Sequence, residues 1–155
     1  VIIAAIVLGP VDGAIIGGIW GLLTWVRAFV APSSPLAPLV FVNPLVSVVP
    51  RIMIGILAGY TFILMCRLIK AKYIAAVGAA IVGTLTNTGL VLGFIYLFYR
   101  TPAVAQTYGV NVNHLLIALE TVMATNGLAE LILAIIIVPM VALPVLEVRR
   151  RLEVS

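Results

Sequence analysis

Four long apolar stretches constrain this chain of 155 residues more than any other feature of its sequence. They run from Val11 to Val30, from Arg51 to Ile69, from Tyr73 to Tyr99 and from Leu115 to about Leu146. About 20 helical residues cross the hydrocarbon of a bilayer, and stretches of this length and apolarity are typical of membrane-spanning helices. We therefore predict an all-α integral membrane protein in which residues 1–155 form a single transmembrane domain.

The composition and the missing motifs exclude most soluble and catalytic functions. Hydrophobic residues make up 64% of the chain and charged residues 9%, whereas soluble domains carry about 25% charged residues. The sequence contains no HExxH, GxSxG, GxxxxGK[ST] or CxxC motif, so we expect no catalytic residue, no metal and no cofactor. An enzyme within the membrane is a remote alternative, and any ATP hydrolysis would be carried out by partner subunits.

The first eight residues are apolar but too short to span a membrane by themselves. Gly9 and Pro10 end them, because proline cannot continue a helix and glycine suits a turn. We interpret residues 1–8 as the second half of a helix that begins before the sequence does. The expected membrane segments are therefore 1–8, 11–30, 51–69, 73–99 and 115–146, with loops at 31–50 and 100–114.

Two basic clusters predict how these segments are oriented. One lies at residues 67–72, between the second and third stretches, and the other at 149–151, after the fourth. Short segments rich in Lys and Arg stay on the cytoplasmic side. We therefore predict a multi-pass protein of the bacterial cell membrane with the 67–72 loop and the C-terminus in the cytoplasm. The clusters then reflect topology, and no nucleic-acid partner is expected.

Polar side chains gather in the half of the membrane that this topology places outside. Residues 83–90 read GTLTNTGL, and Thr84, Asn87 and Thr88 share one face of their predicted helix. An amide without a partner in hydrocarbon costs several kcal/mol. A proton pump or channel would spread polar groups through the full thickness, so the one-sided distribution favours an outward-facing pocket for a small polar ligand. Other candidates in this half are Trp20, Trp25, Arg27, Arg51, Arg100, Glu120 and Asn126.

These residues also have purely structural interpretations. The threonine hydroxyls can bond to a carbonyl one turn back, and Asn87 can hold a neighbouring helix. Arg51 and Arg100 can be anchors at the membrane interface. Glu130 lies four residues after Asn126 on the same face and can be a partner in an ion pair or amide bond. The sequence leaves the choice between ligand and neighbouring helix open for Asn87.

Glycines recur every four residues on three of the stretches. At this spacing they share one helix face and let two helices approach closely. The simpler interpretation is tight packing within the bundle. The alternative is that one stripe docks on a partner membrane protein, and our candidate for this role is the stripe nearest the start of the sequence. The three stripes are Gly13, Gly17 and Gly21, then Gly55 and Gly59, then Gly89 and Gly93.

Several segments together resemble a known family. The segments are VIIAAIVLGPVDGAIIGGIWGLLTW at the start, NPLVSVVPRIMIGILAGY at 43–60, GTLTNTGLVLGFIYL at 83–97 and TNGLAELILA at 125–134. Their order and spacing resemble the substrate-binding S components of energy-coupling factor (ECF) transporters, and among these the pantothenate-type components most. The chain departs from the family in that the family's first helix has no counterpart in this sequence, so docking residues cannot be carried over from that helix.

The resemblance implies a compact bundle of six helices that captures a water-soluble vitamin from outside with high affinity. It also implies partners: a transmembrane coupling subunit, two cytoplasmic ATPase subunits and the lipid bilayer. For a pantothenate carboxylate, Arg100 is our first candidate and Arg51 our second. Asn87 and Asn126, with Thr84 or Thr88, would bond the amide and hydroxyls. Trp and Tyr side chains, Trp25 among them, would supply apolar walls.

Two other functions stay open. Within the same class the ligand could be another vitamin such as hydroxymethylpyrimidine, and a neutral or cationic ligand would not need an arginine. In a different class, the chain could be a structural or assembly subunit of a membrane complex that binds no ligand. That function predicts a pocket filled by the protein's own side chains.

Overall fold

The computed structural model describes residues 1–32 and 37–154, apart from the side chains of residues 122, 123, 153 and 154. Within these residues the regular structure is entirely helical, and residues 33–36 of the proline-rich 31–50 loop lie outside the described part. The elements in chain order are α1 (Ile2–Val7), α2 (Pro10–Val30), α3 (Ala37–Val40), α4 (Pro44–Ser47), α5 (Val49–Ile69), α6 (Lys72–Phe98), α7 (Pro102–Thr107), the 3-10 helix η1 (Val112–His114), α8 (Leu115–Val122), the π-helix η2 (Met123–Gly127) and α9 (Leu128–Val154).

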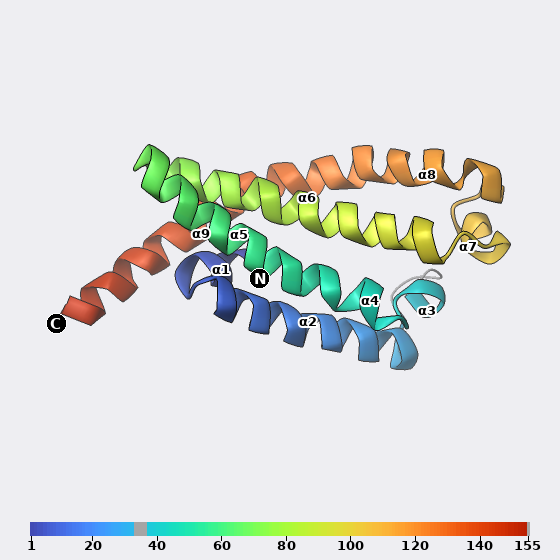
Figure 1. Cartoon of the computed structure of the whole chain (residues 1–155), viewed down its shortest axis with the longest axis horizontal. Helices are drawn as coiled ribbons and strands as arrows, with labels where there is room; N and C mark the ends of the chain where they lie inside the picture. The colour runs from blue at the N-terminus through green and yellow to red at the C-terminus, as the bar shows by residue number, and fades with distance from the viewer. Residues whose placement is uncertain (33–36, 155) are drawn as a thin grey trace.

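Four helical segments of the described chain are long and apolar enough to cross a membrane. They are Pro10–Val30, Pro44–Ile69, Lys72–Phe98 and Val112–Leu152. Figure 1 shows α2, α5, α6 and α8 lying side by side along the long axis of the molecule. Many large apolar side chains of the four segments, such as Leu23 and Leu133, are exposed, as lipid-facing residues are. The chain is therefore an all-α integral membrane protein.

The bundle has two ends of different character. The short helices α3, α4 and α7 gather at one end, which we call the loop end (right in Figure 1). The turn between α5 and α6 and the C-terminal part of α9 lie at the other, the basic end, which carries Arg67, Lys70 and residues 149–151. Lys70 makes the turn after α5 in a left-handed conformation, with φ of 57°. Because loop prolines begin α4, α5 and α7 at their first or second residues, the loop end is folded and not extended.

The glycine stripe of α2 packs inside the chain. A Cβ atom added to Gly13 would lie 2.5 Å from the Cβ atom of Ala5, and one added to Gly21 would lie 2.7 Å from the Cα atom of Val48. At Gly17 it would collide with the backbone carbonyl of Arg51. All three glycines are buried, so this stripe brings α2 against α1 and α5. The stripe therefore packs within the chain, as the simpler interpretation expects.

Two separate apolar clusters hold the bundle together. The cluster toward the basic end is built from α1, α5, α6 and α9, where small residues such as Ala76 and Ala79 allow close packing. The cluster at the loop end joins α3, α4, α6, α7 and α8 through residues such as Ile95 and Leu115. Between Ala80 and Ile95, the buried residues of α6 are Gly83 and Thr84. The apolar core is therefore interrupted along the middle of α6.

Candidate functional site

A hollow of about 210 Å³, which we call the central hollow, opens at this interruption of the core. Five elements or turns contribute to it: the turn after α3, then α5, α6, η2 and α9. Its polar side chains come from residues far apart in the sequence, and its apolar walls come from the α3 turn and α6. The lining residues are Phe41, Arg51, Asn87, Thr88, Val91, Leu92, Asn126, Gly127 and Glu130.

The side-chain amide of Asn87 has an unusual environment. Its Oδ1 atom is buried and accepts no hydrogen bond from any described residue. A buried carbonyl oxygen without a donor costs roughly 1–3 kcal/mol, and such groups in native proteins are rare. The structure thus does not support the interpretation that this oxygen clamps a neighbouring helix. A hydrogen-bond donor from outside the chain would satisfy it.

Arg51 is the cation that the structure brings to the central hollow. The guanidinium donates a hydrogen bond from Nη1 to the carbonyl oxygen of Val46 at 3.1 Å and stacks over the ring of Phe41 at 5.6 Å from its centroid. The carbonyl contact uses one of five donors, so the others are available to a ligand. The Glu130 carboxylate lines the same hollow. The hollow therefore contains a positioned cation with an acidic group nearby.

A local change in helix type brings two further residues into the lining of the central hollow. The segment Met123–Gly127 is a π-helix between α8 and α9, and it carries Asn126 and Gly127 into the lining. A π-helical turn widens the helix by one residue and re-aims the side chains around it, often at functional sites. Glu130 follows in the first turn of α9. Asn126 and Glu130 thus line the same hollow, as their spacing of four residues predicts.

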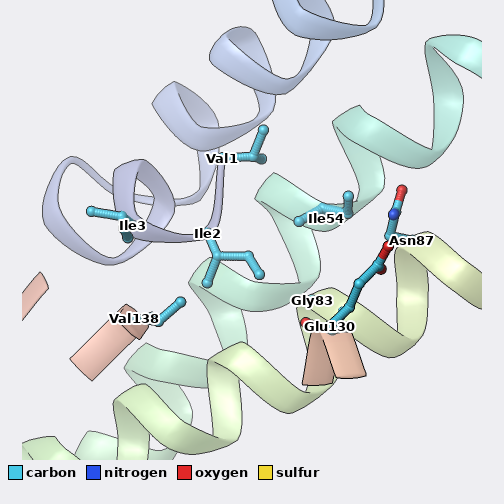
Figure 2. Close-up of a pocket in the computed structure, with 9 residues that line it drawn as sticks. Val1, Ile2, Ile3, Ile54, Gly83, Asn87, Glu130 and Val138 are labelled. Carbon is cyan, nitrogen blue, oxygen red and sulfur yellow. The ribbon is translucent and has the colours of Figure 1, made fainter. Parts of the chain in front are cut away.

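A second hollow of about 290 Å³, the inner hollow, adjoins the central one. Asn87 and Glu130 line both and thus separate them. Figure 2 shows the Glu130 side chain directed toward Asn87, with Ile54 on the opposite helix and Ile2 and Val138 further along. Thr84 is buried and also lines this hollow. The inner hollow is mostly apolar, with its polar groups at the boundary with the central one.

Four of the residues selected from the sequence meet in the central hollow: Arg51, Asn87, Thr88 and Asn126. Thr84 faces the inner hollow. Among the side-chain hydrogen bonds of the described residues, several threonine hydroxyls bond one turn back, as Thr24 does to Trp20, but those of Thr84 and Thr88 do not. Asn87, Thr88 and Val91 line one hollow together, so these three residues share a face of α6.

Two selected residues lie outside these hollows. Arg100 is exposed after the end of α6, where its guanidinium lies 5.7 Å from the centroid of the Tyr96 ring. Trp25 donates a hydrogen bond from Nε1 to the carbonyl oxygen of Val42 at 2.7 Å and packs edge-on against Phe29. Trp25 thereby ties α2 to the α3–α4 turn, and neither residue lines the central hollow.

The sequence did not single out Phe41, Leu92 or Gly127 as site residues. Phe41 reaches the hollow because the proline-rich loop folds back as α3 and α4, and its position cannot be read from periodicity. Glu130 was interpreted as a structural partner, although its shared face with Asn126 was a usable signal. Among the described residues no group of three His, Cys, Asp or Glu side chains could hold a metal ion.

Comparison with known proteins agrees with the resemblance of the sequence segments. A sequence model of the family described as "ECF transporter, substrate-specific component" matches residues 1–142. The chain is 34% identical to the pantothenic acid transporter PanT of Lactococcus lactis subsp. cremoris (strain MG1363), with 88% of this chain and 69% of that protein covered. It is 35% identical to the pantothenate transporter PanT of Leuconostoc mesenteroides subsp. mesenteroides, with 89% of this chain and 68% of that protein covered.

Proposed function

The chain belongs to the family of substrate-specific components of ECF transporters, and we propose that it binds pantothenate in the central hollow. Two relatives at 34% and 35% identity carry the name of pantothenate transporters. Pantothenate has a carboxylate at one end, two hydroxyls at the other and an amide between them. The polar groups of the central hollow suit these three parts.

The carboxylate is assigned to Arg51. A guanidinium can donate two parallel hydrogen bonds to a carboxylate, and such charge-assisted bonds are about twice as strong as neutral ones. Arg51 is half-buried and lines the hollow, whereas Arg100 is exposed to solvent beyond α6. The contact of Arg51 with the Val46 carbonyl fixes its direction before a ligand arrives, which lowers the entropy lost on binding.

The observation that carries the proposal is the unsatisfied Oδ1 atom of Asn87. A pantothenate hydroxyl or its amide N–H would donate to this atom and remove the cost of the buried oxygen. Thr88 and Asn126 lie around the same hollow and offer further donors and acceptors. A structural subunit without a ligand would fill such a space with its own side chains and would leave no unpaired oxygen there.

The Glu130 carboxylate favours one orientation of the ligand in the hollow. A carboxylate beside Glu130 would be repelled, but a hydroxyl can donate to the Glu130 side chain. Arg51 lies on α5 near the loop end, whereas Glu130 and Asn87 border the inner hollow. The carboxylate is therefore placed toward the loop end and the hydroxyl end toward Asn87 and Glu130.

This orientation fits a pocket that loads from outside. The loop end would face the exterior, and residues 67–72 and the C-terminus would face the cytoplasm, as the basic clusters indicate. A transmembrane coupling subunit with two cytoplasmic ATPase subunits would supply the energy for release. The chain itself would act as a non-catalytic binding subunit.

Matched arginine substitutions test the assignment of the carboxylate. We expect Arg51→Gln to weaken pantothenate binding by roughly 10- to 100-fold, since a hydrogen bond to a charged group contributes about 1.5–3 kcal/mol. Arg100→Gln removes the same charge at the same end of the bundle and should keep the affinity within about threefold. Titration calorimetry of the purified chain in lipid nanodiscs measures both. A loss of pantothenate affinity in Arg100→Gln alone would overturn the assignment of the carboxylate to Arg51.

A further inference from the structure

A third hollow lies between the central hollow and the loop end. It encloses about 200 Å³, and we call it the outer hollow. Phe41 and Arg51 line both this hollow and the central one, so these two side chains separate them. The other lining residues come from α2 and from the first residue of α3: Thr24, Arg27, Ala28 and Ala37.

The outer hollow is lined by two guanidinium groups. Arg27 enters it from α2 and Arg51 from α5, and the small side chains of Ala28 and Ala37 are both buried in its wall. The Glu130 carboxylate lines the central hollow and not the outer one. None of the described residues that line the outer hollow is acidic. Its charge is therefore positive, which favours an anion.

Arg27 lies in the last turn of α2, where a cation complements the helix dipole. It is exposed, near the loop end of a helix whose neighbours are apolar. The described ion pair of the chain joins Arg151 and Glu147 at the opposite end, and no described carboxylate pairs with Arg27. A charged side chain costs least here when it borders water, and a positive charge in this position would attract anions near the loop end.

We propose that Arg27 and Arg51 form an outer anion subsite that receives the carboxylate of the ligand before it enters the central hollow. The inference rests on the proposed binding of pantothenate in that hollow. In the first step the carboxylate contacts Arg27 and the outward side of Arg51. In the second step Phe41 gives way, and the carboxylate stays with Arg51 while the hydroxyl end reaches Asn87. Arg51 thus serves both subsites, and Arg27 only the first.

This division predicts a kinetic signature for Arg27. A unit charge near the entrance raises the association rate of an anion, and salt screens this effect. Because Arg27 does not line the central hollow, the dissociation rate should change little. We expect Arg27→Gln to lower the association rate constant of pantothenate about three- to tenfold at low salt, with less than twofold change in the dissociation rate.

Stopped-flow fluorescence on the full chain in neutral-lipid nanodiscs tests the predicted role of Arg27 in association. The ligands are pantothenate and its neutral alcohol analogue. Arg27→Gln should slow association of pantothenate but leave the alcohol unchanged, and 0.5 M salt should abolish the difference. Arg100→Gln, at the same end but outside the hollows, should have less than twofold effect, and Arg27→Lys should restore most of the rate. Equal slowing of both ligands would indicate a structural role and overturn the subsite.

The two proposals fail in different ways in this experiment. If wild-type protein binds neither ligand, the proposed function is wrong. If wild-type protein binds pantothenate but Arg27→Gln associates at the wild-type rate in low salt, the central site stands and the outer subsite is wrong.

Discussion

Replacing Gly21 by alanine tests the packing of α2 against the junction of α4 and α5. The added Cβ atom would lie 2.7 Å from the Cα atom of Val48 and 2.9 Å from the carbonyl oxygen of Ser47. Carbon atoms in contact prefer about 3.5–4.0 Å, so the overlap is about 1 Å. Both neighbours are backbone atoms, so the helices must separate to relieve it.

The expected magnitude follows from two opposing effects. Overpacking of this kind costs about 1–3 kcal/mol, while alanine gains up to about 1 kcal/mol over glycine in helix propensity. We therefore expect Gly21→Ala to lower the free energy of unfolding by about 1–2 kcal/mol. Gly89→Ala is the matched control, because nothing lies within 4 Å of the Cβ position there. It should raise the free energy of unfolding by roughly 0.5–1 kcal/mol.

Reversible unfolding in mixed micelles, followed by tryptophan fluorescence, measures both variants. A Gly21→Ala protein as stable as the wild type would refute this close packing of α2. If that variant instead lost only its assembly with a coupling subunit, the stripe would be a docking surface after all.

Two further predictions concern the loop end. Phe41→Ala removes the ring that separates the central and outer hollows. Association and dissociation of pantothenate should therefore both become faster, while the dissociation constant stays within about tenfold of the wild-type value. Stopped-flow traces in which neither rate rises would contradict this prediction. Burial raises the pKa of the Tyr108 phenol above its ordinary value of 10.0. The unfolded chain therefore loses this proton at a lower pH than the folded chain does. The folded state loses stability as the pH rises above about 10. Tyr108→Phe should flatten that decline in unfolding experiments between pH 8 and 11, and an unchanged slope would show that the phenol does not cause it.

The apolar pattern predicts the long helices closely but not the loop end. For example, the third stretch was predicted over 73–99, and α6 runs from Lys72 to Phe98. The length of an apolar run and its proline and glycine stops determine such boundaries locally. The short helices α3, α4 and α7 depend on contacts with α2, α6 and η1, and local sequence does not specify these.

The contacts of the glycine stripes could not be predicted from local sequence either. Gly17 and Gly89 belong to repeats of identical spacing, yet a Cβ atom at Gly17 would collide with α5 while one at Gly89 would meet nothing within 4 Å. Spacing places residues on one face of a helix, but it does not say what lies opposite. For that reason the sequence could not choose between packing and docking.

The central site could be predicted in part. Arg51, Asn87, Thr88 and Asn126 were found because polar groups are rare in a membrane segment and their helical phases were readable. Arg51 and Arg100 were both candidates because both lie at the same end, and only the fold shows that Arg51 lines the hollow. The π-helix at Met123–Gly127 has no local sequence signature, although it directs Asn126 into the site.

The most direct test of the account is a calorimetric titration of the purified wild-type chain with pantothenate and with its neutral alcohol analogue. We predict saturable one-to-one binding of pantothenate. The alcohol should bind roughly 10- to 100-fold more weakly, because it loses the charge-assisted bonds to Arg51 while keeping those to Asn87. Absence of pantothenate binding, or equal affinity for the two ligands, would contradict the account.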